Sequence, residues 1–488
     1  MEWSLHEKIN LINNNTMKRT VVITGLVLMT QFAFSQGGTM SLKQCVETGI
    51  ANNQQVFQSG LQAETDEIGW KQAKLNRLPN LNGSVGHGIN RGRSIDPFSN
   101  SYIDQQINFA NYGVSSGVVL FNGLTLQNTV KQNKLTYDAS TMDWQQAKDN
   151  LTINIILAYL QVLSSEDVLT QSRNQAELSK KQVERLEVLN KEGAIAPYLL
   201  SDLKGQFAND QLAILAAQNA VETAKINLSQ FMNVPYDRNM SLERLDAASF
   251  AMKYEETPDK IYQTALQQFS LVKAVDLRKQ SAETGVKVAK GGLYPTLSLN
   301  GNINTNYSDA ARRDVFLNTT DFVSDNYVVV NGNPSPVIYK QNNYRSDKIN
   351  YGDQLNNNLF STVSLNLRIP IFNSLAARNR IKLAQIDLRN REMIAKTTRT
   401  QLQQSIDQAH VNMTTASERY KTLLEQVNAF TESFRAAEIR FNSGVGNSVD
   451  YLTAKNNLDR VNVNLVNAKY DFVLRTRVLD YYQGKTLW

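Results

Sequence analysis

The chain has 488 residues, a formal net charge of +6 and one cysteine. At about 150 residues per domain, this length allows about three domains or two copies of something larger. No run of about 18 apolar residues occurs, so a transmembrane helix is not expected, and the single cysteine excludes an internal disulfide. Lysines and arginines alternate with acidic residues and form no basic block, which favours a mixed solvated surface over a nucleic-acid partner.

Residues 1–35 form a signal-peptide region. Met17-Lys18-Arg19 is a basic start, residues 20–34 are apolar, and Ala33-Phe34-Ser35 is a small-residue cleavage site, which together predict export. Residues 1–16 do not fit this signal, so translation from Met1 and from Met17 both stay open. Cys45 follows a poor lipoprotein sequence, and we expect it to pack on a helix face without a lipid anchor.

The sequence contains two internal repeats, a first structural repeat at 36–256 and a second at 257–488. The stretch "AKLNRLPNLNGSVG" resembles "AKGGLYPTLSLNGN", which begins 216 residues later (289 − 73). Further along, "LFNGL" matches "IFNSL" and Gly193 aligns with Gly444, both at an offset of 251 residues (444 − 193). Because helices in register tolerate no insertion whereas loops do, the constant offset predicts continuous helices. The change of offset places 35 extra residues (251 − 216) between two strands of the second copy.

Each copy carries a predicted β-hairpin, at 80–121 and at 296–372. In the second hairpin, "LSLNGNIN" alternates apolar residues with residues that bear amides or hydroxyls, the period of two that indicates a strand with two unlike faces. The insert of the second copy, about 308–359, lacks such a period and is rich in Asn, Asp, Tyr and Pro. We therefore expect it to be a long surface loop.

Two interpretations of the four strands stay open. A soluble sheet would pack its apolar face on helices, whereas a membrane barrel would turn that face to lipid and its polar face to a lumen. Four strands leave open edges, which hydrocarbon does not tolerate, and closure needs about eight strands or more. A membrane barrel would therefore need several chains, and we favour it because the polar face is unusually rich in Asn and Ser.

The helical segments are too long for a globular domain. The first long segment, at about 1.5 Å per residue, would span about 100 Å. Apolar residues follow a heptad pattern in both return segments, which predicts coiled-coil packing. Asp210 and Arg475 interrupt this seam and would be paired, face a lumen, or lie at a surface. The predicted helices are 122–192, 195–232, 373–443 and 447–482.

The stretches "VVLFNGL" and "LRIPIFNSL" join a strand directly to a helix. Pro370 cannot donate a ladder hydrogen bond, so pairing should weaken there. Phe372 is a candidate wedge at the transition, and Asn373 is a candidate N-cap of the following helix. The junction residues that we single out are Phe121, Asn122, Pro370, Phe372 and Asn373.

With this doubled layout, the chain resembles the TolC-like outer-membrane efflux proteins of Gram-negative bacteria. The resemblance covers the chain from residue 36 to its end, and rests on "LPNL", "YPTL", "LRIPIFNS" and "SGVGNSVDYLTAKNNL" in this order. It implies a mixed α/β fold of mainly long helices, in which a homotrimer builds a 12-stranded transmembrane barrel, four strands per chain, continued by a periplasmic coiled-coil α-barrel. It also implies a passive exit duct of a tripartite efflux or type I secretion system. Its partners would be a periplasmic membrane-fusion adaptor, an inner-membrane pump of RND or ABC type, and outer-membrane lipid, without a cofactor.

The same resemblance implies site residues at the ends of the long helices. Glycine-containing turns would dock the adaptor, and an acidic residue after the second turn would narrow the closed periplasmic end. Asp450 occupies that acidic position, although an ordinary exposed acid beside a helix start is an equal alternative. Where some relatives carry a second acid, this chain has Thr453. The candidate docking residues are Gly193, Ala194, Ile195, Ser443, Gly444 and Val445.

Two other classes of protein fit the sequence less well. An enzyme is disfavoured because His87 and His410 lie in different elements, and no metalloprotease, nucleophile-elbow or phosphate-loop motif occurs. A trimeric coiled-coil stalk or adhesin would explain the heptads but not the four amphipathic strands. The sequence therefore favours the duct and keeps the stalk as its alternative.

Overall fold

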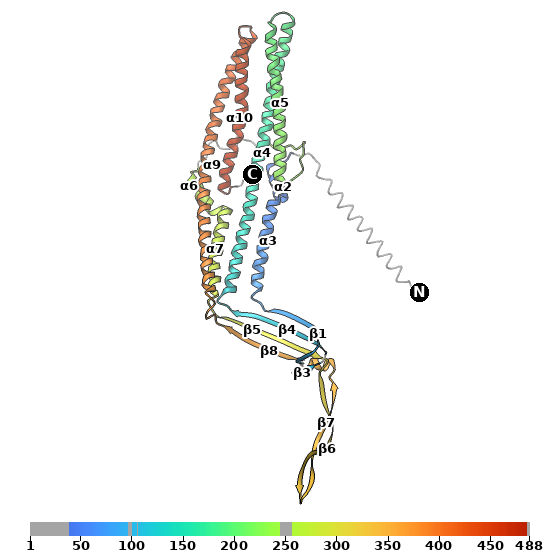
Figure 1. Ribbon diagram of the computed structural model, residues 1–488. Coiled ribbons are helices and arrows are strands. Elements are labelled where there is room, and N and C mark those ends of the chain that lie inside the picture. The colour runs from blue at the N-terminus through green and yellow to red at the C-terminus, as the bar shows by residue number, and fades with distance from the viewer. Residues whose placement is uncertain (1–38, 96–99, 105, 245–255, 486–488) are drawn as a thin grey trace, which may run out of the picture. The chain divides into compact units, whose positions relative to one another are not determined.

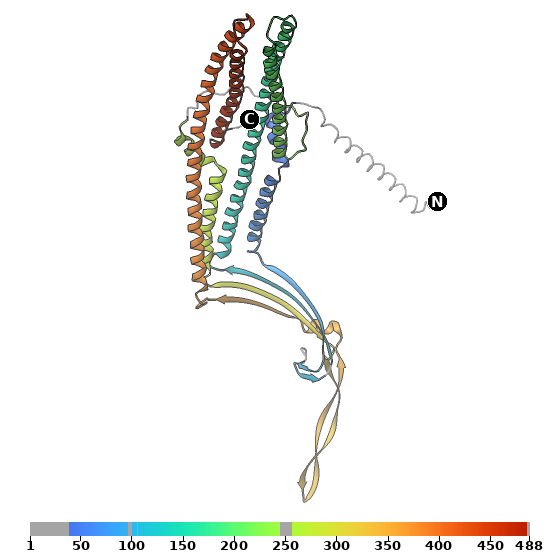
Figure 2. The same ribbon diagram turned by 45° about the horizontal axis from the view of Figure 1, so that its top comes forward.

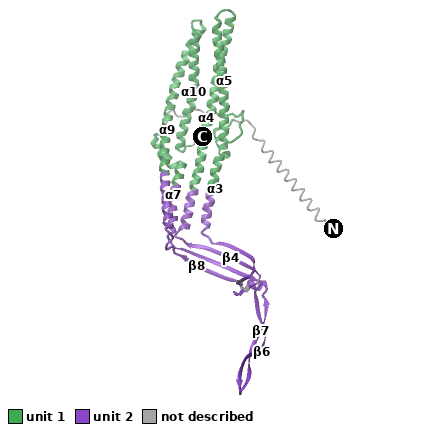
Figure 3. Ribbon diagram, in the orientation of Figure 1, with its two compact units in different colours: residues 1–63, 138–276, 394–488 green, residues 64–137, 277–393 purple. Residues whose placement is uncertain are grey.

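The computed structural model describes residues 39–95, 100–104, 106–244 and 256–485 (Figures 1 and 2). The expected signal peptide lies outside the described residues. Among the helices of the described residues, none combines the length and the apolar character needed to span a membrane. The chain divides into two units, 1–63 with 138–276 and 394–488, and 64–137 with 277–393 (Figure 3). We call them the helical unit and the sheet unit.

The sheet unit is built on four antiparallel strands in the order β1-β4-β5-β8. These strands are β1 (Asn80–Asn90), β4 (Ile107–Phe121), β5 (Thr296–Ser308) and β8 (Phe360–Arg368). β1 and β8 each pair on one side only, so the sheet has two free edges. The short strands β2 (Arg93–Ile95) and β3 (Tyr102–Asp104) form a separate hairpin between β1 and β4.

The prediction of an irregular loop at 308–359 is wrong. This segment contains β6 (Arg312–Val330) and β7 (Asn333–Lys348), which pair as a long two-stranded ribbon, and the short helix α8 (Tyr351–Asn357). The register shifts twice along β6, between Phe316 and Asn318 and between Val323 and Tyr327. Each shift changes the phase of the side chains, so no continuous period of two is visible in the sequence.

The helical unit contains the greater part of two helices of equal length. α4 (Thr125–Lys191) and α9 (Ala376–Asn442) each have 67 residues, and their starts are 251 positions apart (376 − 125). α5 (Pro197–Met232) and α10 (Ser448–Tyr482) return beside them. The equal lengths agree with the constant offset in the sequence, since a helix in register tolerates no insertion.

Apolar clusters hold these four helices and their shorter neighbours together. α2 (Leu42–Asn52) begins with a capping box between Ser41 and Gln44 and packs with α4, α5 and α10 around the fully buried Tyr159. α6 (Pro258–Gln268) packs against α9 and α10 through Ile261. Cys45 is buried in the first cluster, as expected for a small residue on a helix face. Two further helices, α3 (Gln54–Leu75) and α7 (Ser270–Gly291), each run from one unit into the other.

Candidate functional site

One face of the four-stranded sheet is mostly polar. Cross-strand neighbours on it include Asn111 opposite Asn306 and Ser115 opposite Asn302. The side chain of Asn80 accepts a hydrogen bond of 2.8 Å from the backbone N–H of Gly117. A hollow of about 360 Å³ opens on this face, lined mainly by amide, hydroxyl and glycine residues. By the strand register, the only charged residue on this face of the four strands is Arg368, at the end of β8.

The opposite face of the sheet is mostly apolar, and it is exposed along the two edge strands. Leu81 and Val85 on β1 and Val363 and Leu365 on β8 project from it, and Val363 is 79% exposed. A soluble sheet would bury such residues against helices. Instead, the strands that carry the most exposed apolar side chains are the two with unpaired edges.

Both strand–helix junctions pass through two consecutive residues with positive φ. These are Gly123 and Leu124 at 66° and 63°, and Ser374 and Leu375 at 54° and 63°. The left-handed region is unfavourable for leucine, so two equivalent leucines in it mark a shared, locally strained turn. The helices begin only after these residues, three positions later than expected from the sequence.

The predicted N-cap role of Asn373 is wrong for this reason. α9 begins at Ala376, whose N–H donates to the backbone carbonyl of Asn373, 3.0 Å away. Asn122 differs, because its side chain accepts a hydrogen bond of 3.3 Å from the N–H of Leu126 inside the first turn of α4. β8 ends at Arg368, so strand pairing stops before Pro370.

Two junction phenylalanines occupy different settings. Phe121 is the last residue of β4 and pairs with Leu297 after an irregularity in the register. Phe372 is 79% exposed in the single chain, so its role as a wedge stays a prediction. The first junction is also the tighter one, since a Cβ on Gly123 would lie 2.5 Å from the carbonyl oxygen of Gly291. That close approach explains a glycine where the second copy has Ser374.

We expect the two junction asparagines to contribute unequally to stability. Asn122→Ala removes a side-chain acceptor at a helix start and should lower the free energy of unfolding by about 0.5–2 kcal/mol. Asn373→Ala should change it by less than about 0.5 kcal/mol, because the side chain of Asn373 makes no hydrogen bond within the described residues. Thermal unfolding of the purified protein in detergent measures both, and equal losses would contradict the assignment.

The candidate docking residues lie at two similar helix ends. Gly193 has φ +70°, and the N–H of Ala194 donates to the carbonyl of Leu189 at 2.8 Å. Gly444 has φ +74°, and the N–H of Val445 donates to the carbonyl of Arg440 at 3.0 Å. Both ends are thus closed by the glycine motif that satisfies the last carbonyls of a helix.

Exposure separates the six docking candidates. Gly193, Ala194, Ser443 and Gly444 are exposed, and Val445 is 77% exposed. Ile195 instead packs against the apolar cluster between the helices. The turns therefore present small and apolar groups at their surface, and their role as an adaptor site stays a prediction.

Asp450 lies in the first turn of α10 with an exposed side chain. Its backbone N–H donates to the side chain of Asn447, the N-cap, at 2.7 Å. A carboxylate at this position is favourable with the helix dipole alone. The geometry therefore fits both an ordinary helix-start acid and the predicted gate.

Asp210 is paired, one of the three alternatives that the sequence left open, but within a buried charge cluster whose other members the sequence did not single out. Lys455 on α10 is 1% exposed, and its ammonium lies 3.0 Å from Asp210 on α5 and 2.6 Å from Asp459. Asp210 also accepts a hydrogen bond of 2.5 Å from Ser179 on α4. Burial raises the pKa of Asp459, and the ammonium of Lys455 opposes that rise. The interruption of the seam by Asp210 was the only available signal, because its partner Lys455 stands outside that seam.

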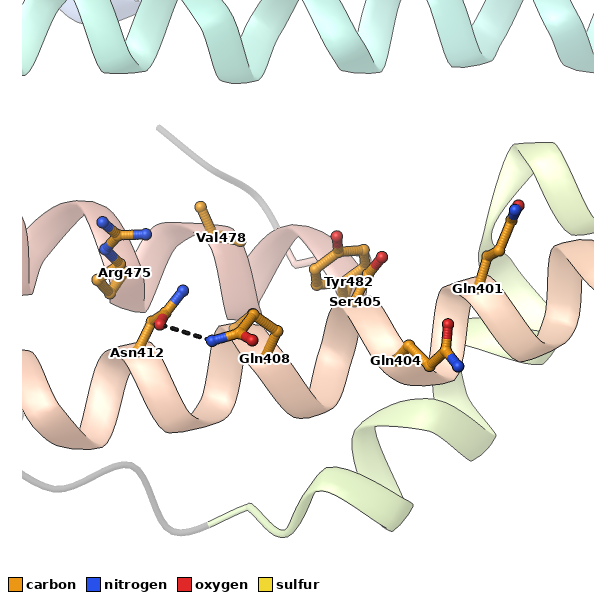
Figure 4. Close-up of a pocket in the computed structure, with 9 residues that line it drawn as sticks. Gln401, Gln404, Ser405, Gln408, Asn412, Arg475, Val478 and Tyr482 are labelled. Atoms are coloured by element: carbon orange, nitrogen blue, oxygen red, sulfur yellow. Dashed lines mark hydrogen bonds between the residues drawn. The ribbon is translucent and has the colours of Figure 1, made fainter.

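Arg475, the other residue that interrupts the seam, lies beside a polar hollow of about 600 Å³ between α9 and α10. Figure 4 shows Gln401, Gln404 and Gln408 on one side of it. The guanidinium of Arg475 lies 3.0 Å from Asp471. Amide groups dominate this lining, and across the residues that the structure describes no group of three His, Cys, Asp or Glu is placed to hold a metal ion.

Comparisons with known proteins agree on one family and one fold. The family described as "Outer membrane efflux protein" matches residues 48–234 and 261–480. The outer membrane protein TolC of Vibrio cholerae serotype O1 is 22% identical over 400 residues, 81% of this chain and 80% of that protein. The CmeC outer membrane channel of Campylobacter jejuni has a TM-score of 0.72 at 17% identity, over 91% of this chain and 85% of its own. The outer membrane protein VceC of Vibrio cholerae has a TM-score of 0.70 at 14% identity, over 92% and 97%.

Proposed function

The chain belongs to the outer membrane efflux protein family, and from this premise we propose that three copies assemble into a passive exit duct. In this proposal the four-stranded sheets of three chains close a 12-stranded barrel in the outer membrane, and the two halves of each chain are copies of one repeat. The helices continue the barrel into the periplasm. A membrane-fusion adaptor docks at the helical turns, and an inner-membrane pump of RND or ABC type supplies the energy.

The sheet carries this proposal. It has an exposed apolar face, a polar face with one charged residue, and two unpaired edges. Hydrocarbon accepts a sheet only when every edge is paired, and four strands are too few to close a barrel. Pairing β1 of one copy with β8 of the next satisfies both requirements, and it places the amide-rich face around the lumen.

Exposed apolar residues on the helices support the same assembly. Leu383, Ile386 and Met393 on α9 are each exposed by 59% or more and are separated by three and seven residues. Ile68 and Leu75 on α3 are exposed at a spacing of seven. These are the intervals of coiled-coil seams, so we propose that each is covered by a neighbouring chain.

Assembly is tested by placing charges on one of these exposed seams. Leu383→Asp with Ile386→Asp should dissociate the trimer, because the substitutions would bury carboxylates in an apolar interface. Lys382→Asp, on an exposed neighbouring residue, should leave it intact. Analytical ultracentrifugation in detergent measures the mass of each variant. A trimer that persists in the double variant would exclude this seam from the interface.

Conductance separates the duct from a coiled-coil stalk. The purified trimer should give current steps in a planar lipid bilayer, and Asp450→Ala should increase them if three carboxylates narrow the periplasmic end. A trimer that gives no current, in the unsubstituted protein and in Asp450→Ala alike, would refute the duct and favour the stalk.

Cysteines at Ala194 and Val445 should cross-link to the cognate adaptor, while one at the exposed Lys180 should not.

A further inference from the structure

The β6–β7 ribbon carries an apolar end that the proposed duct does not use. We call residues 322–339 the ribbon tip. Its only charged residue is Asp325, and none occurs from Asn326 to Tyr339. Its exposed large apolar residues are Phe322, Val323, Tyr327, Val328, Val329, Val330, Ile338 and Tyr339. The rest of the ribbon is mostly polar, with Phe316, Leu317 and Tyr344 as its exposed large apolar residues, so apolar residues are concentrated at its far end.

The ribbon projects well beyond the sheet. β6 has 19 residues, which at about 3.3 Å per residue span about 60 Å. Figure 2 shows the ribbon leaving the end of the sheet opposite to the start of α4 and α9. If the sheet crosses the outer membrane with its helices in the periplasm, the tip stands outside the cell. A two-stranded ribbon is marginally stable alone in water, so a partner for its apolar end is required.

Both faces of the ribbon tip are apolar. The strand register places Val323 with Ile338, and Val329 with Pro334, on one face. Phe322 and Tyr339 pair on the other, with ring centroids 5.2 Å apart. Its partner must therefore cover two faces and not one.

The edges of the tip are poorly suited to a further strand. Asn331 and Gly332, with φ of 51° and 84°, form the two-residue turn, and the pair that flanks such a turn is hydrogen-bonded. Because bonded and non-bonded pairs alternate, Pro334 and Pro336 fall where an N–H would point to the free edge. Prolines at these positions remove donors and discourage edge pairing, which leaves the faces for contact.

Lipid is a poor occupant of this surface. Backbone groups along the free edge of β6 stay unpaired, and an open edge is not tolerated in hydrocarbon. The turn itself is polar, with Asn331, Gly332 and Asn333 at its apex. The part of the tip that would enter a bilayer first is thus its least apolar part.

We propose that the ribbon tips of the three copies pack on one another, one face of each against the opposite face of the next. This inference rests on the proposed trimer. A cyclic assembly uses two different surfaces of each chain, which fits a ribbon that is apolar on both faces. Three ribbons fixed to one rim also meet at a high effective concentration, so that a second copy of this chain is the nearest apolar partner. The tips then form a collar beyond the barrel.

Cross-linking within the trimer tests the collar. Ile338→Cys combined with Phe322→Cys places one cysteine on each face and serves as the reporter with a short bis-maleimide, and the native Cys45 is buried, so that its thiol does not compete. We expect this double-cysteine reporter to give linked dimers and trimers, and adding Val329→Asp on the face of Ile338 to reduce them about tenfold. Thr319→Asp, on that face but in the polar part of the ribbon, should leave the yield unchanged.

The outcomes separate this inference from the proposed function. A trimer that conducts while the double-cysteine reporter stays unlinked would overturn the collar and leave the duct in place. Protection of the reporter by added phospholipid vesicles, or its capture by another protein in place of a second copy, would also overturn it. Loss of the trimer in the unsubstituted protein would instead refute the assembly on which both depend.

Discussion

Replacing Lys455 with alanine is expected to lower the free energy of unfolding of the helical unit by about 3–5 kcal/mol. The substitution leaves the carboxylate of Asp210, which is 7% exposed, without its cationic partner. A buried charge that loses its partner keeps the full cost of leaving water. Denaturant titration of the purified protein, followed by its helical circular dichroism, measures the loss.

A charge-free variant distinguishes a lost charge partner from lost packing. Lys455→Met with Asp210→Leu and Asp459→Leu removes all three charges of the cluster and should recover most of the stability, because apolar replacements of buried ion pairs are often neutral or stabilising. Lys421→Ala, in the exposed pair with Glu418, should cost less than about 1 kcal/mol. A single Lys455→Ala variant as stable as the unsubstituted chain would contradict the buried cluster.

The long helices were predictable because their signal is repeated and local. The offset of 251 residues holds from the strand–helix junctions to the glycine turns, and α4 and α9 begin that far apart. Pro197 and Ser448 begin the return helices within two residues of the expected starts. Alternation likewise located the four strands of the sheet, since each carries mostly polar residues on one face and mostly apolar residues on the other.

Other features depend on contacts that no local pattern records. Leucine has no preference for a positive φ, so the sequences "FNGL" and "FNSL" do not predict that Leu124 and Leu375 adopt one. Lys455 is an ordinary helix residue until α5 brings Asp210 beside it. The two strands of the β6–β7 ribbon were not predicted, because two register shifts and an apolar tip interrupt the alternation of polar and apolar residues that indicates a strand. In each case, the missing information lies in tertiary structure.

Leu365→Arg and Ser364→Arg are expected to have opposite consequences, although the two residues are neighbours on β8. Leu365 projects from the exposed apolar face, and Ser364 pairs with Asn300 on the polar face. An arginine on the lipid face near the bilayer midplane costs about 2–4 kcal/mol, so Leu365→Arg should reduce folding into the outer membrane. Reversible unfolding from lipid vesicles measures that loss.

Ser364→Arg should fold normally and change conduction instead, because its cation would face a water-filled lumen. In the proposed trimer it adds three positive charges to those of Arg368, so the reversal potential in a salt gradient should shift toward anions. If Ser364→Arg prevented folding while Leu365→Arg did not, the two faces would be assigned the wrong way round. If both folded with unchanged conduction, β8 would not line a channel, and the exposed apolar face of the sheet would require a protein partner in place of lipid.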